Sequence, residues 1–434
     1  MNTLFRTAQR YPAQIWLLFW GTLTSSMGNG LVWPFLAIYI REQLDVSLTT
    51  VTLLITLQSV AGFAATAIIG PVMDQFGRKR AMVLGLISSG LTIFTMSTAI
   101  ALWHWVLLLP LFAMTNAVFR IGSYAMVADL IAPEKRANVY ALLRMGDNVG
   151  IAVGPALGGF LIAVAYRVSY YFAAAAQVAL VPFTLILINE TLALSRAETA
   201  DEDEPASAST PRSGAGYARL LQDRAFLTVW LLYVLVQIAA TMVFVLLGVY
   251  LKESFGIPEN RFGFIIGTNA AMVVLLQYAL TRAVGRFQPL PVMVAGALFY
   301  AAGMAAFGLS QAFAAFLLGM VIFTTGELLL VPTGTALAAN LAPPDMRARY
   351  MGFFTLSFRL SGAVGPVIGG LLSDNIAPVA TWYGGMAFCL VGAAGFWMLI
   401  GRDLFDVREP ETAQDLIAES PLEPLVEQCT ETGK

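Results

Sequence analysis

Five ionisable side chains interrupt apolar runs that are long enough to cross a membrane. They are Arg120, Arg144, Asp147, Glu327 and Arg359. Charged groups are costly inside a bilayer and usually mark a substrate or proton path. Burial favours the neutral form of a carboxylic acid, whereas a nearby arginine favours the carboxylate. An acid whose surroundings change can therefore take up and release a proton, so we expect these five residues to serve proton coupling or substrate binding.

The two acids differ in their neighbours along the sequence. At about 1.5 Å of rise per residue, Arg120 and Asp147 lie at matching depth in antiparallel helices, so we expect them to pair. Arg144 lies three residues before Asp147 on nearly the same helix face and competes for it. No cation lies near Glu327 in the sequence. Glu327 is therefore the predicted proton carrier, with a substrate contact or a packing role as alternatives, and Asp147 is the rival carrier or half of a structural ion pair.

Membrane-spanning helices must position these side chains, because 58% of the 434 residues are hydrophobic and only 12% are charged. Soluble proteins are about 45–50% apolar and about 25% charged. A spanning helix needs about 20 mostly apolar residues. The chain has twelve such blocks, at 14–40, 48–71, 81–101, 105–130, 138–164, 168–190, 225–251, 261–284, 290–309, 312–340, 349–373 and 377–400.

Composition also excludes several classes of function. The net charge of −2 offers no basic surface for nucleic acid. The single histidine, His104, excludes a histidine-based metal site. The sequence shows no cluster of nucleophile and metal ligands and no phosphate-binding loop. We therefore expect neither an enzyme nor an ATP-driven pump, and no cofactor.

The loop charges predict the orientation in the membrane. Most lysines and arginines fall on one side of the twelve blocks, and the other side holds only Arg41, Arg167, Lys252 and Arg261. Loops rich in lysine and arginine stay in the cytoplasm. Both termini and the central segment are therefore expected to be cytoplasmic, in a multi-pass protein of the cytoplasmic (inner) membrane.

Two polar segments divide the chain. Residues 191–224 contain Asp-Glu-Asp-Glu followed by Pro, Ser, Thr and Gly, which is typical of a solvated linker. Residues 401–434 form an acidic tail. A regulatory role for either segment is the alternative to a plain linker and tail. Residues 1–190 and 225–400 remain as two predicted six-helix bundles.

The two halves are related in sequence. A shift of 211 residues places Gly154-Pro155 on Gly365-Pro366, and Asp129 on Asn340, without a gap. A match sustained over about thirty positions indicates duplicated halves. Repeats of this kind in membrane proteins usually frame a central substrate path.

A glycine-rich and charged run joins the blocks 48–71 and 81–101. Its notable residues are Gly70, Asp74, Gly77, Arg78, Lys79 and Arg80. The glycines permit a tight turn, and an aspartate can cap a helix start. This run resembles the GxxxDxxGRK signature of the major facilitator superfamily, apart from the apolar exchanges at Val72 and Met73.

That resemblance implies a latch between the two halves. Asp74 would contact the start of the block 349–373, and Arg78 would pair with Asp129 at the end of the block 105–130, in the outward-open state. The alternative is that the run only sets topology, as a turn with positive charge inside. The corresponding loop of the second half has lost the acid.

The block 138–164 carries glycines on one helix face, smooth enough for a second backbone to approach. The residues are Gly150, Gly154, Pro155, Gly158 and Gly159. The pattern is similar to the GxxxGPxxGG signature of the antiporters of this family, which are mostly drug/proton exporters. Generic helix packing is the alternative, and the copy at Ser361, Gly365, Gly369 and Gly370 shows that packing contributes. The arginine that such exporters often carry in the outer half of helix 4 is missing here.

The resemblance implies an all-α membrane protein with the major facilitator fold, twelve helices in two pseudo-symmetric bundles. We predict a monomeric secondary transporter working by alternating access, whose partners are protons, a small-molecule substrate and the lipid bilayer. Its expected activity is proton-coupled export of multiple drugs or amphipathic compounds. The alternatives are a transporter of an anionic metabolite that uses the cavity arginines, or a non-transporting membrane sensor.

Overall fold

The computed structural model describes residues 11–192, 219–343 and 346–401, and the predicted linker and tail lie almost entirely outside these ranges. Helices make up nearly all of the described chain. Those of the first bundle are α2 (Ala13–Gly30), η1 (Trp33–Phe35), α3 (Leu36–Leu44), α4 (Leu48–Phe76), α5 (Arg78–Met96), α6 (Leu102–Leu130), α7 (Pro133–Val164) and α8 (Tyr166–Leu187). Those of the second are α11 (Arg224–Phe255), α12 (Glu259–Val284), α13 (Pro289–Leu309), α14 (Phe313–Leu341), α15 (Arg347–Asn375) and α16 (Ala380–Leu399).

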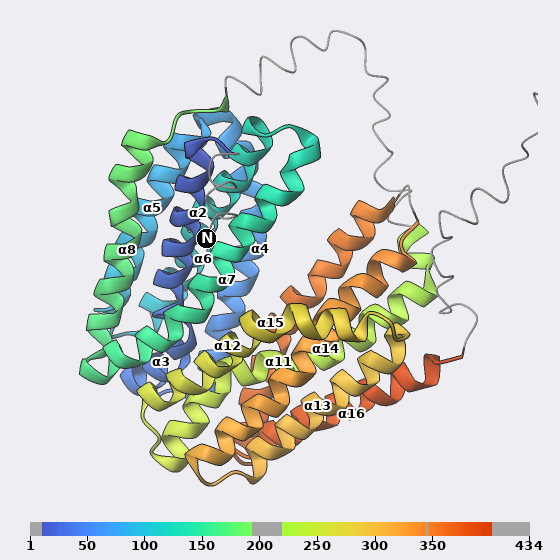
Figure 1. Cartoon of the computed structure of the whole chain (residues 1–434). Helices are drawn as coiled ribbons and strands as arrows, with labels where there is room; N and C mark the ends of the chain where they lie inside the picture. The colour runs from blue at the N-terminus through green and yellow to red at the C-terminus, as the bar shows by residue number, and fades with distance from the viewer. Residues whose placement is uncertain (1–10, 193–218, 344–345, 402–434) are drawn as a thin grey trace, which may run out of the picture.

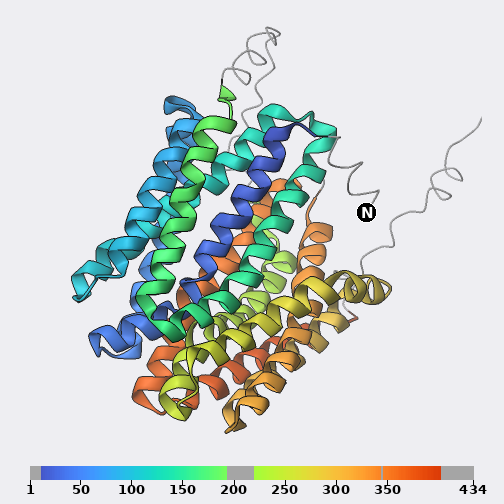
Figure 2. The same cartoon turned by 60° about the vertical axis from the view of Figure 1, so that its left-hand side comes forward.

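The helices form two bundles that lie side by side (Figures 1 and 2). Within the described ranges, ten helices are long and apolar enough to cross a membrane by length and composition. Of the helices that correspond to the twelve predicted blocks, α2 and α5 fall short of this measure. The second half of α2 is rich in Gly, Ser, Thr and Asn, and α5 begins with three basic residues. The all-helical membrane fold itself is confirmed.

The first predicted block, 14–40, is not one continuous helix. It breaks between α2 and α3, where Trp33–Phe35 forms a short 3-10 turn. Pro34 has no backbone N–H to donate and clashes with the preceding helical turn. Gly28 and Gly30 further weaken the helix just before the break.

The glycine face of α7 packs against two different helices. A Cβ atom placed on Gly154 would lie 2.7 Å from the Cα atom of Gly30, so α2 and α7 are in backbone contact. A Cβ on Gly159 would lie 3.0 Å from the carbonyl oxygen of Glu259, on α12 of the other bundle. Close packing of this kind requires residues without side chains.

The second half repeats this arrangement at the same offset of 211 residues. A Cβ on Gly365 of α15 would lie 2.6 Å from the carbonyl oxygen of Ile238 on α11. A Cβ on Gly370 would lie 2.9 Å from the hydroxyl of Thr52 on α4, in the first bundle. The sequence repeat is therefore also a repeat of packing, in which α7 and α15 each join their own bundle to its partner.

Polar contacts between the bundles gather near one face of the molecule, called the closed face here. The Nε atom of Arg41 lies 2.7 Å from Glu253, Lys252 pairs with Glu42, and Asp374 accepts from the backbone N–H of Thr49 at 2.7 Å. The ribbons diverge toward the opposite face (Figure 1). We call that face, which holds the ends of α4, α6, α12 and α14 and the basic residues beside them, the basic face.

Candidate functional site

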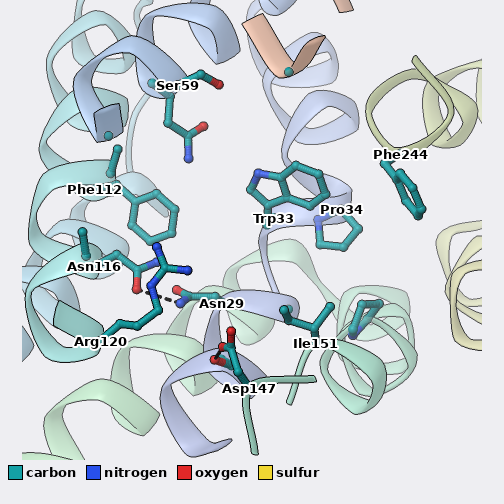
Figure 3. A pocket seen from close by; sticks show the side chains of 18 of the residues that line it. Asn29, Trp33, Pro34, Ser59, Phe112, Asn116, Arg120, Asp147, Ile151 and Phe244 are labelled. Carbon is teal, nitrogen blue, oxygen red and sulfur yellow. Dashed lines mark hydrogen bonds between the residues drawn. The ribbon is translucent and has the colours of Figure 1, made fainter. Parts of the chain in front are cut away.

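A cavity of about 540 Å³ lies between the two bundles. Side chains from α2, η1, α4, α6 and α7 line it on one side, and side chains from α11, α12 and α15 line it on the other. Figure 3 shows part of its wall, in which aromatic and apolar side chains alternate with amides and charged groups. A concave site with an apolar lining and a few polar groups is typical of a small-molecule pocket.

The structure brings together three of the five ionisable residues that the sequence singled out. Arg120, Asp147 and Arg359 all line the cavity. Arg144 has an exposed side chain and is not part of the lining. Glu327 is also absent from the lining, although its side chain is only partly buried. Of the four helices that carry these five residues, α6, α7 and α15 contribute side chains to the lining and α14 does not.

The predicted ion pair between Arg120 and Asp147 is not formed. Instead, the hydroxyl of Ser26 donates a hydrogen bond to Asp147. Within the described ranges, no nitrogen of Arg120 lies within ion-pairing distance of a carboxylate. Figure 3 shows the Arg120 side chain beside Asn29 and Asn116, whose side-chain amides bond to each other at 2.7 Å.

Close packing of α2 on α7 explains why Asp147 accepts a hydrogen bond from Ser26. Gly150 lies one helical turn after Asp147, and a Cβ on it would lie 2.6 Å from the carbonyl oxygen of Leu23. The two backbones are therefore close enough for Ser26 to reach the carboxylate. Arg120 and Asp147 do line the same cavity, but a similar predicted depth does not determine which neighbour an acid contacts.

Glu327 lies behind the cavity wall and is joined to it by one amide. The Nδ2 atom of Asn269 donates hydrogen bonds to the Glu327 carboxylate at 2.7 Å and to the Thr324 hydroxyl at 3.0 Å. Asn269 itself lines the cavity. Its pairing with Glu327 could not be found from the sequence, because the two residues lie on different helices and 58 positions apart.

The run from Gly70 to Arg80 differs from the predicted loop. Residues 70–76 belong to α4, and Gly77 alone separates α4 from α5, with φ at +91°. A positive φ favours glycine, which lacks a Cβ atom. Asp74 therefore lies in the last turn of a helix, with an exposed side chain, and does not cap a helix start.

The structure places Arg78 next to Asp129, with Nη1 2.7 Å from the carboxylate. Both side chains are largely buried, and Asp129 also accepts from the Thr191 hydroxyl at 2.5 Å. The pair joins α5 to the end of α6 within one bundle. The expected contact of Asp74 with α15 belongs to a different conformation, in which the two bundles separate at the face that is closed here. It therefore stays a prediction.

Glu190 is a residue that the sequence reasoning missed. Its carboxylate accepts from the backbone N–H groups of Arg78 and Lys79 at 3.0 and 3.1 Å. These N–H groups lie in the first turn of α5 and have no acceptor within the helix, and a negative charge is favourable at this end of a helix. This carboxylate offsets the cost of three basic residues at a helix N-terminus, and the only sequence signal was an acid at the end of the sixth apolar block.

The comparisons with known proteins agree with this geometry. The model described as Major Facilitator Superfamily matches residues 18–235 and 229–428. The chain is 27% identical over 416 residues to a protein of Planococcus maritimus named "Na(+), Li(+), K(+)/H(+) antiporter", covering 87% of this chain and 93% of the relative. It is 25% identical over 392 residues to multidrug resistance protein MdtH of Yersinia pestis, covering 89% and 92%.

Solved structures share the fold at low sequence identity. A point mutant of the nucleoside transporter NupG superposes with a TM-score of 0.75 at 14% identity, covering 89% of this chain and all of that one. A bacterial homologue of the lysosomal transporter Spinster, in an inward-facing and unoccupied conformation, gives a TM-score of 0.72 at 13% identity, covering 89% and 96%.

Proposed function

Since the chain belongs to the major facilitator superfamily and is a secondary transporter rather than an enzyme, we propose that it exports amphipathic compounds in exchange for protons. The observation that carries this proposal is the cavity between the bundles. It has an acid, Asp147, in its wall and a second acid, Glu327, joined to it through Asn269. Both a proton and a substrate can thus reach one central site.

The relatives' names support antiport, since one is called a cation/proton antiporter and another a multidrug resistance protein. The cavity wall supports an amphipathic substrate. Its apolar part includes Trp33, Phe112, Phe244 and Ile151, and its polar part includes amides and hydroxyl groups. Aromatic faces bind flat apolar groups, while amides and hydroxyls satisfy polar atoms.

The charges at the basic face support an orientation in which that face is cytoplasmic. That face holds Arg78, Lys79 and Arg80 together with Arg282 and Arg286, and positive loops remain cytoplasmic. With the basic face inside the cell, the closed face is external, and the bundles stand in an inward-facing arrangement. Export then begins with substrate entering the cavity from the cytoplasm.

The proposal is tested with purified protein in liposomes of acidic lumen, diluted into neutral buffer that contains a panel of amphipathic dyes. A proton/compound exchanger should accumulate at least one dye inside the vesicles. Accumulation should disappear when nigericin collapses the pH gradient. Uptake that is indifferent to the gradient would contradict proton coupling, and no flux of any kind would favour a sensor.

A further inference from the structure

Two guanidinium groups from different bundles share the central cavity. Arg120 comes from α6 of the first bundle and Arg359 from α15 of the second. Arg359 extends across the cavity, because its Nη1 atom lies 4.0 Å from where a Cβ on Gly62 of α4 would be. The same point lies 3.5 Å from the Cβ of Ala113, which precedes Arg120 by two turns of α6. The Arg359 guanidinium therefore reaches the wall of the first bundle, and the Arg120 side chain lines the same cavity from α6 of that bundle.

Neither guanidinium group has a partner that neutralises it. Within residues 11–192, 219–343 and 346–401, neither makes an ion pair or a hydrogen bond. The only carboxylate of the cavity lining is Asp147, which accepts from Ser26. Two cations and one acid leave the lining with a net positive charge. Like charges that share one cavity repel, so an anion between the two guanidinium groups would stabilise both.

An apolar surface accompanies the two arginines. Phe112 lies on α6 between Arg120 and the closed face, and Trp33 and Pro34, on η1 of the same bundle, also line the cavity (Figure 3). Trp33 keeps 39% of its surface exposed, although it lies in the centre of the protein. A bound molecule can therefore have an apolar part of aromatic size next to its charged group.

We propose that the cavity selects amphipathic anions, holding a carboxylate, sulfonate or phosphoryl group between Arg120 and Arg359 and an apolar body against Trp33 and Phe112. This inference rests on the proposed function only in taking the cavity as the transport site. Guanidinium groups bind such oxyanions with paired, charge-assisted hydrogen bonds. Because each bundle supplies one arginine, the anion also links the two bundles and favours their closure around it.

The charges of the cavity disfavour a cationic substrate. A lipophilic or inorganic cation would enter a site that already holds two positive charges and would meet one carboxylate that is engaged with Ser26. A neutral compound would use the apolar wall alone. Affinity should thus follow the charge of the head group when the apolar body is constant.

The experiment uses three probes that share one ring system: 2-naphthoate, neutral 2-naphthalenemethanol and cationic 2-naphthylmethylammonium. Binding to purified protein is measured by isothermal titration calorimetry at pH 7.5. The wild type should bind naphthoate at least about tenfold more tightly than the ammonium probe, as expected for hydrogen bonds between charged groups. Arg120→Gln and Arg359→Gln should each weaken naphthoate binding by at least about tenfold and leave the alcohol unchanged.

Two further variants separate charge recognition from folding. Arg359→Lys keeps the charge without the planar fork, so its affinity for naphthoate should fall between those of the wild type and Arg359→Gln. Arg282→Gln removes a guanidinium at the end of α12, outside the cavity lining, and should bind like the wild type. Equal affinity for the anionic and cationic probes, no naphthoate binding by the wild type, or unchanged binding in both cavity variants would overturn the proposal.

Transport of the same probes tests the two proposals separately. If naphthoate binds through the arginines but no probe moves with a pH gradient in liposomes, the anion site stands and proton-coupled export is wrong. If the ammonium probe is driven by the gradient and Arg359→Gln carries it at the wild-type rate, export stands and anion selection is wrong.

Discussion

Proton coupling is a question about two carboxylates, Glu327 and Asp147. Glu327 contacts the cavity through Asn269, with no cation beside it in the described chain. We expect Glu327→Gln to bind substrate but to lose accumulation driven by a pH gradient, because an amide cannot carry the proton. Downhill exchange should survive. The measurement compares gradient-driven uptake with counterflow in proteoliposomes.

Asp147→Asn is the matched comparison for that experiment. The sequence argument against Asp147 was that Arg120 would keep it charged, and the structure removes that reason by pairing Asp147 with Ser26. Gradient-driven uptake by Glu327→Gln together with its loss in Asp147→Asn would assign the proton to Asp147. Glu327 would then be a packing residue that holds Asn269.

The sequence singles out the ionisable residues of the apolar runs, but most of their contacts could not be predicted from it. Arg120 and Asp147 line the same cavity, and the pair of Arg78 with Asp129, which the family resemblance implied, is present in the structure. The rotation of a helix about its axis and the partner it faces depend on packing between distant segments. For this reason the pairings of Asp147 with Ser26 and of Glu327 with Asn269 appear only in the structure.

At the scale of elements, the spacing of α2 and α7 depends on glycine. We expect Gly154→Ala to lower the free energy of unfolding by about 1–3 kcal/mol, because its methyl group would overlap the backbone of Gly30 and Met27. Gly352→Ala is the control: nothing lies within 4 Å of its Cβ position, so the helix should gain about 0.5–1 kcal/mol. Thermal unfolding in detergent measures both, and equal effects would contradict the close-packing argument.

The elements themselves were predictable where hydrophobicity is uniform and unpredictable where it is interrupted. The blocks 225–251 and 377–400 agree closely with α11 and α16, since their apolar residues continue without a break. The first block divides at Pro34, and the expected loop after residue 71 is helical as far as Phe76. Whether a short polar stretch extends a helix or interrupts it depends on the contacts that its residues make. A hydropathy profile carries no information about those contacts.

In the proposed transport cycle closure alternates between the two faces of the molecule, so contacts at each face should shift the balance of states in opposite directions. Replacing Arg41 by Gln removes a partly exposed pairing with Glu253 and Asp374 at the closed face. An exposed pair contributes about 0.2–1 kcal/mol, and the pair with Glu253 is the closer of the two. Its loss should raise the population of the state in which this face is open by up to about fivefold. Spin labels at Asp45 and Ile376 in a cysteine-free background would report this as a larger fraction of long distances.

Asp74→Asn should act in the other direction if Asp74 latches the basic face to α15 when that face closes. Removing the latch then favours the arrangement described here, so the fraction of long distances between the same two labels should fall. Transport should slow more than substrate affinity declines, because a latch changes the populations of states rather than the binding site. A distance distribution and a transport rate that both match the wild type would show that the motif only sets topology. Opposite shifts from Arg41→Gln and Asp74→Asn, which lie at opposite ends of the first bundle, would instead show that both faces bias one shared equilibrium.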